Sequence, residues 1–161
     1  VMAAALLSAA FLSFAGLVAT LVVGLTAGGE AALLRHTTVG IFSTMLTLLT
    51  HSMMMFYLMG KGRAVREAAT EGGLSSEFSV EIARRRRPVF SIGTIAMSLT
   101  ITTAVVGASV DVRVVPPAVH AVLAYAALAA NIATLKVEIV ALAASARIVD
   151  EVNRLLQAEG P

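Results

Sequence analysis

Three histidines, His36, His51 and His120, are the residues best suited to bind a cofactor, and each lies in a long apolar stretch. A stripe of polar residues accompanies them on two of these stretches. His120, Asn131 and Glu138 are separated by 11 and 7 residues, which places all three within about 20° of one direction on a helix. On the stretch that holds His36, five residues share a sector of roughly 80°: His36, Ser43, Thr47, His51 and Met54.

Two of the histidines are expected to meet. His36 and His120 each fall in the first turn of a predicted helix that starts on the same side of a bilayer. Polar stripes on membrane helices turn toward the interior of the bundle. Two imidazoles at one depth on facing helices are what a b-type haem with two axial histidines requires. The sequence therefore predicts an outer haem b held by His36 and His120.

A second axial pair is also predicted deeper in the bundle. His51 lies about nine residues from the inner end of its helix, and Met97 lies nine residues into the next one, at a similar depth. Asn131 and Glu138 bracket this level, so His51 has an alternative role as a hydrogen-bonding group between helices. Copper binding by the methionines Met53 to Met55 and Met59 is disfavoured, because three consecutive side chains point in three directions.

The elements that position these residues follow from composition. The chain has 161 residues, of which 58% are hydrophobic and 14% charged, and it contains no Cys. Average globular proteins have about 25% charged residues. This composition excludes a soluble domain, a disordered chain, a disulfide scaffold and a Cys-ligated metal site.

Four charge-free stretches are each long enough to cross a bilayer, which takes about 20 apolar residues. We predict an all-α, integral membrane, antiparallel four-helix bundle forming a single domain. Pro88 and Pro117 are each expected in the first turn of a helix. The first stretch is expected to be a retained helix, since no basic segment precedes it as in a signal peptide. The spans are predicted at about 2–27, 33–60, 88–109 and 117–146.

Basic residues set the expected orientation. Seven of the 12 Lys and Arg residues lie between the second and third spans, including the run Arg84 to Arg87. By the positive-inside rule both termini are cytoplasmic. Four consecutive arginines could form a site for nucleic acid or anionic lipid, but directly beside a membrane helix we interpret the run as a topology anchor. We expect no binding to nucleic acid. Residues 61–87 are predicted to form a cytoplasmic helical hairpin that breaks at Gly72-Gly73, and residues 147–158 a C-terminal helical extension packed on it.

Several functions fit this layout. The sequence favours a membrane haem protein, or a haem-bearing subunit of an electron-transfer complex, in a bacterial cytoplasmic membrane. The alternatives are a non-catalytic subunit of a membrane complex, and a proton or ion pathway through His36, His51, Asn131 and Glu138. The expected partners are lipid and either other membrane proteins or further copies of the chain. Motifs for nucleotide, zinc or covalent haem binding are absent, no internal repeat is expected, and the question of catalysis stays open.

Overall fold

The chain forms four long helices. The computed structural model describes residues 1–158, and in that range it contains α1 (Met2–Leu25), α2 (Glu30–Glu71), α3 (Glu77–Asp111) and α4 (Pro117–Ala158), with no strand. Continuous runs of Ala, Leu, Val and Ile favour helix here because apolar and polar residues do not alternate with the period of a strand. The predicted all-α class is confirmed.

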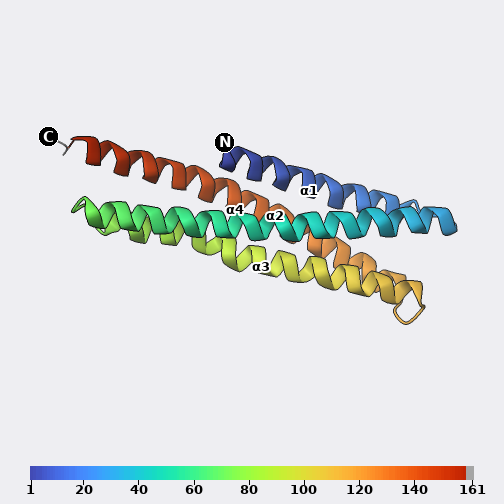
Figure 1. Cartoon of the computed structure of the whole chain (residues 1–161). Helices are drawn as coiled ribbons and strands as arrows, with labels where there is room; N and C mark the ends of the chain where they lie inside the picture. Colours follow the sequence, from blue (N-terminus) through green and yellow to red (C-terminus); the bar gives the residue numbers. More distant parts are fainter. Residues whose placement is uncertain (159–161) are drawn as a thin grey trace.

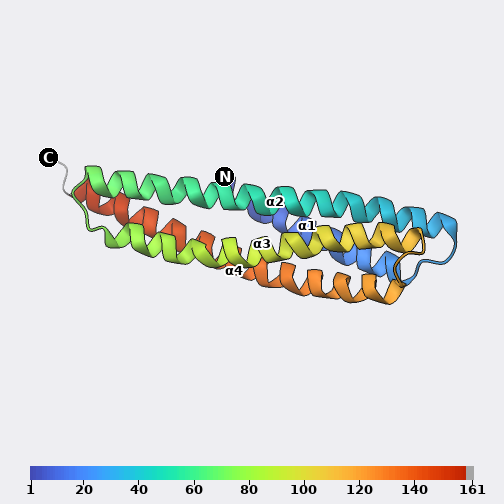
Figure 2. The ribbon, with the colours of Figure 1, turned by 90° about the horizontal axis from the view of Figure 1, so that it is seen from below.

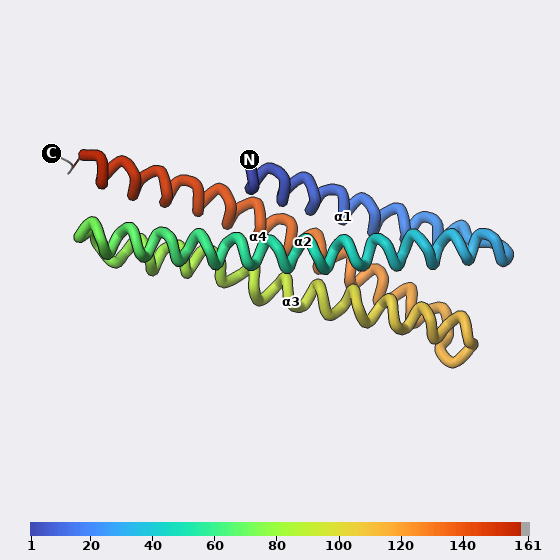
Figure 3. Tube along the Cα trace, in the orientation of Figure 1, coloured from blue at the N-terminus to red at the C-terminus, as the bar shows by residue number. Residues whose placement is uncertain are grey.

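The helices lie side by side in alternating directions (Figures 1 and 2). α1 and α2 form one hairpin, and α3 and α4 form the other. Residues 26–29 and 112–116 connect the helices of each hairpin, and both connections lie at the same end of the molecule, which we call the loop end. At the other end α2, α3 and α4 project beyond the start of α1 and form a three-helix extension (Figure 3).

Helix length and surface composition both suggest a membrane protein. Each of the four helices is long and apolar enough to cross a membrane. α2 has 42 residues and is roughly 63 Å long, whereas the hydrocarbon core of a bilayer is only about 30 Å thick. Large apolar side chains face outward, such as Phe42 and Phe56, each 68% exposed. An apolar surface of this extent requires lipid or protein partners to cover it.

Two clusters of apolar side chains hold the helices together. The first lies in the middle of the bundle and includes Met54, Leu58 and Val89. The second lies in the extension, where Val65, Ile82 and Val152 come from three different helices and are 2–3% exposed. Residues 147–158 therefore continue α4 and pack on the α2–α3 turn region.

The proline and glycine residues that were predicted at helix ends lie there, except for Pro88. Pro117 begins α4, and Gly73 adopts φ +65° in the turn after α2. Pro88, however, lies inside α3, so its predicted place in a first turn is wrong. The helix continues through it because Ile82 and Val89, on either side, are both buried in the two apolar clusters. This packing offsets the loss of one main-chain hydrogen bond.

Candidate functional site

His36 of α2 and His120 of α4 face each other near the loop end. Their ring centroids are 6.0 Å apart and their planes meet at 79°. Both side chains are half-buried. The two hairpins thus each contribute one imidazole to a common site, although the histidines lie 84 residues apart in the sequence.

The two rings are held in the same way. The Nδ1 of His36 lies 3.1 Å from the carbonyl oxygen of Thr20 on α1, and the Nδ1 of His120 lies 3.1 Å from the carbonyl oxygen of Thr103 on α3. A carbonyl oxygen only accepts, so Nδ1 carries the hydrogen and donates it in both cases. In the neutral form of each ring, the Nε2 atom then keeps its lone pair. Histidine ligands of metals are oriented by such a bond from their other nitrogen.

A glycine permits each of these contacts. A Cβ atom on Gly24 would lie 2.7 Å from Cε1 of His36, and one on Gly107 would lie 2.9 Å from Cε1 of His120. Real Cβ atoms do not approach other carbons so closely, so any larger residue would displace the ring. Glycine is therefore needed at both positions for the imidazoles to pack against the neighbouring helix.

These contacts reveal an internal repeat, contrary to the expectation from sequence. The segments Thr20-Leu-Val-Val-Gly24 and Thr103-Ala-Val-Val-Gly107 agree at four of five positions, and a histidine follows each glycine after 12 or 13 residues. Threonine supplies the carbonyl, glycine the space and histidine the ring in both hairpins. The repeat is short and apolar, so it is hidden among similar stretches, but a search anchored on the histidines would find it.

The third histidine occupies a different site. His51 lies in the middle of the bundle, is 3% exposed, and has both ring nitrogens engaged. Its Nδ1 lies 2.7 Å from Oε1 of Glu138, and its Nε2 lies 2.9 Å from Oδ1 of Asn131. Both partners belong to α4, as the shared face predicted for Asn131 and Glu138 requires.

The two acceptors of the Asn131 NH2 group determine the direction of the other hydrogen bonds in this cluster. The Nδ2 of Asn131 donates to the carbonyl oxygen of Ala127 at 2.8 Å and to Oγ1 of Thr100, on α3, at 3.0 Å. The amide oxygen of Asn131 must then face His51, so the Nε2 of His51 carries a hydrogen and donates it. One further proton lies between Nδ1 of His51 and Oε1 of Glu138. The His51–Glu138 pair is therefore neutral overall. It connects α2 with α4, and the bond from Asn131 to Thr100 connects α4 with α3.

One atom of this cluster lacks a partner. The Oε2 of Glu138 is buried and accepts no hydrogen bond from any described residue, although the side chain is 0% exposed. A buried carboxylate oxygen normally has a hydrogen-bond donor. The cluster can thus accept one more proton or donor at this atom.

The structure does not place any of the remaining candidate ligands, all of them methionines, beside a histidine nitrogen that is free to bind iron. Met97 is half-buried, and its sulfur accepts a hydrogen bond from Oγ of Ser52 at 3.8 Å. Because both nitrogens of His51 already have partners, the predicted pair of His51 and Met97 has no free nitrogen to offer iron. Of the adjacent methionines, Met54 and Met55 are buried in the apolar core and Met53 is 44% exposed. The three point in different directions, as helix geometry dictates.

The two histidine sites are separate. His36 and His51 are 15 residues apart on one helix, which corresponds to about 22 Å along its axis. Comparison of the chain with protein-family models, curated proteins and solved structures gives no match. We therefore infer function from the geometry of these two sites.

Proposed function

We propose that the chain is an integral membrane haem protein in which His36 and His120 are the two axial ligands of one haem b. In this proposal all four helices cross the membrane, and the loop end and its haem lie near the outer leaflet. The three-helix extension and both termini are then cytoplasmic, which the distribution of basic residues supports.

The observation that carries the proposal is the matched pair of imidazoles. Metal–imidazole bonds of about 2 Å on opposite sides of one iron put the two ring centroids about 6 Å apart, and the observed separation is 6.0 Å. Both rings have Nδ1 fixed by a main-chain carbonyl, which leaves Nε2 to act as the ligand. Apolar helices around them supply the dry surroundings in which a haem carries electrons.

Electron transfer is the chemistry that this arrangement favours. Two axial histidines fill both open positions of haem iron, which suits electron transfer rather than binding of oxygen. A haem near one membrane face would exchange electrons with a partner at that face. The exposed apolar surface of the helices is suited to a larger membrane complex or to further copies of the chain.

The experiment is a titration of the purified protein with haemin in detergent. We expect saturation at one haem per chain and a Soret band that shifts on binding. His36→Ala and His120→Ala should each lose high-affinity binding, whereas His51→Gln, the matched control, should retain it. Equal binding by all three variants and the wild type would exclude these ligands, provided that circular dichroism shows the helices intact.

A second candidate function is proton binding at His51 and Glu138, which the unpartnered Oε2 of Glu138 favours. Buried ionisable groups in membrane helices often relay protons. The measurement is proton flux into liposomes that carry the protein and an internal pH dye. Flux that falls in both His51→Gln and Glu138→Gln but not in His36→Ala would favour this function, and flux indifferent to both would exclude it.

A further inference from the structure

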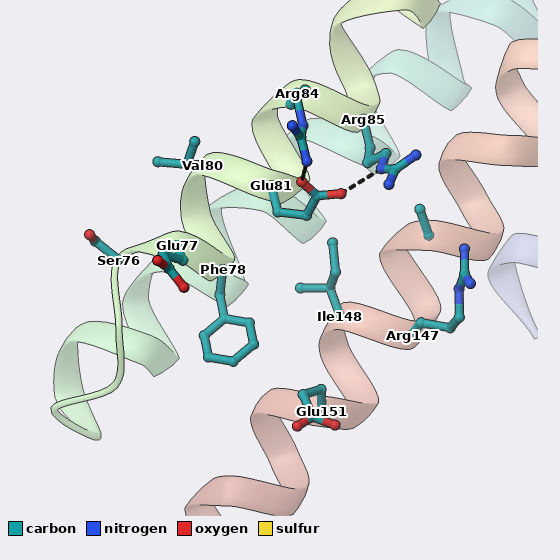
Figure 4. A pocket seen from close by; sticks show the side chains of 11 residues that line it. Ser76, Glu77, Phe78, Val80, Glu81, Arg84, Arg85, Arg147, Ile148 and Glu151 are labelled. Atoms are coloured by element: carbon teal, nitrogen blue, oxygen red, sulfur yellow. Dashed lines mark hydrogen bonds and ion pairs between the residues drawn. The ribbon is translucent and has the colours of Figure 1, made fainter.

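Residues of α3 and α4 line a groove on the surface of the bundle. The groove has a volume of about 480 Å³ and is lined by three cations and three apolar residues: Arg84, Arg85, Lys136, Pro88, Val137 and Val140. No acidic side chain lines it. It adjoins a larger groove of about 680 Å³ that continues along the extension and shares Arg84 and Arg85 (Figure 4).

Charge is balanced in the larger groove but not in the smaller one. Figure 4 shows Glu81 between Arg84 and Arg85, with ion pairs to both. Glu77 and Glu151 add negative charge to the larger groove beside Arg147. One carboxylate shared by two guanidinium groups leaves both arginines with hydrogens to donate. The smaller groove therefore keeps an excess of positive charge.

Lys136 is the decisive residue. It lies within the apolar part of α4, it is exposed, and it makes no ion pair with any acidic side chain in residues 1–158. The nearby carboxylate of Glu138 pairs with His51 instead. A lysine at this position can extend its side chain toward the membrane surface, where the head groups of anionic lipids lie. Because no acidic side chain in residues 1–158 pairs with it, its charge is available to an anionic ligand.

Apolar residues continue below the cations toward the middle of the proposed membrane. Ile95 lies seven residues from Pro88 on α3, and Ile132 lies four residues from Lys136 on α4, so each shares a helix face with the groove. Both are more than half exposed, at 57% and 53%. A ligand that places a phosphate among the cations can thus lay hydrocarbon along these two residues.

We propose that this groove binds an anionic phospholipid, with its phosphate held by Arg84, Arg85 and Lys136 and its acyl chains along Ile95 and Ile132. The inference rests on the membrane placement proposed above but not on the haem. Basic pockets between membrane helices on the cytoplasmic side are suited to phospholipid head groups. Guanidinium groups bind phosphate through paired hydrogen bonds, and the ammonium group of lysine adds a point charge.

The test compares lipid retention in nanodiscs made of phosphatidylcholine with a minor fraction of phosphatidylglycerol. After mild extraction, native mass spectrometry counts the lipids that stay bound. We expect the wild type to retain phosphatidylglycerol preferentially. Lys136→Gln should weaken its retention about fivefold, the factor that one basic residue contributes at an anionic surface. Lys136→Arg should restore it, and Arg66→Gln, which removes an exposed charge outside the groove, should leave it unchanged.

Three results would overturn the proposal. The wild type could show no preference for phosphatidylglycerol, or Lys136→Gln and Arg66→Gln could weaken retention equally, which would indicate a diffuse charge effect. Displacement of the lipid by excess inorganic phosphate would show that the site binds the phosphate group alone and does not recognise the lipid. Two controls separate this proposal from the proposed function. Loss of haem should leave lipid retention intact, which the haem content of each sample shows. Removal of the protein from membranes by an alkaline wash would contradict the membrane placement itself.

Discussion

At the scale of single residues, the fate of each histidine is decided by its hydrogen-bond partners. His36 and His120 bond to main-chain carbonyls through one nitrogen, whereas His51 has side-chain partners on both. A sequence predicts that a histidine lies in an apolar helix but not which of its ring nitrogens has a hydrogen-bond partner. The polar stripe correctly indicated that Asn131 and Glu138 share a face. The alternative role predicted for His51, hydrogen bonding to Asn131, is present in the structure, which adds the contact with Glu138.

The two glycines beside the rings give a prediction with an internal control. Gly24→Ala and Gly107→Ala should each lower haem affinity at least tenfold, because the added methyl group must displace an imidazole. Gly28→Ala should not, because a Cβ at Gly28 would meet nothing within 4 Å. Haemin titration of the three variants measures this. Equal affinities for Gly24→Ala and Gly28→Ala would show that ring position does not matter.

The buried pair of His51 and Glu138 predicts a strong energetic coupling. Removing one partner of a buried pair leaves the other uncompensated and costs about 3–5 kcal/mol. We therefore expect Glu138→Leu or His51→Leu alone to destabilise the protein more than the double variant does. Unfolding in mixed micelles measures the free energies. Strictly additive effects would contradict the coupling. Glu67→Gln, in an exposed pair with Arg63, should change the free energy of unfolding far less than either buried substitution.

At the scale of elements, apolar length and charge distribution predicted the helices, but packing determined how far they run. Gly72-Gly73 was predicted to end a helix, and α2 ends at Glu71. Pro88 was predicted to begin one and instead lies inside α3, because tertiary packing on both sides of it outweighs the local penalty. The repeat was missed because its signal consists of one threonine, one glycine and one histidine spread over two helices.

The arginine-rich start of α3 predicts a pH dependence. Hydrogen bonds from Arg85 and then Arg84 hold the pKa of Glu81 below its ordinary value of 4.5. A lowered pKa in the folded state stabilises the fold above the ordinary pKa, and this contribution is lost as the pH falls through the lowered pKa. Thermal unfolding should show Glu81→Gln less stable than wild type near neutral pH and equal to it in strong acid. A difference that is independent of pH would contradict this role for Glu81.

At the scale of the whole molecule, the structure places both connections at the loop end and the extension at the other. The chain contains no cysteine, so single cysteines report topology without background. In cells, Gly28→Cys and Val114→Cys should react with a membrane-impermeant maleimide, and Gly73→Cys should react only after permeabilisation. Labelling of Gly73→Cys in intact cells would reverse the proposed orientation, and labelling of all three would contradict the membrane placement.

We propose that one haem b bridges the two hairpins. The absorbance and electron paramagnetic resonance spectra of protein purified from haem-replete cells test this proposal. We predict one haem per chain with six-coordinate, low-spin ferric iron. In His36→Ala and in His120→Ala, the iron should become five-coordinate or the haem spectrum should be lost. His51→Gln should keep the wild-type spectrum. A folded, colourless wild-type protein, or a haem spectrum that survives both alanine substitutions, would contradict the account.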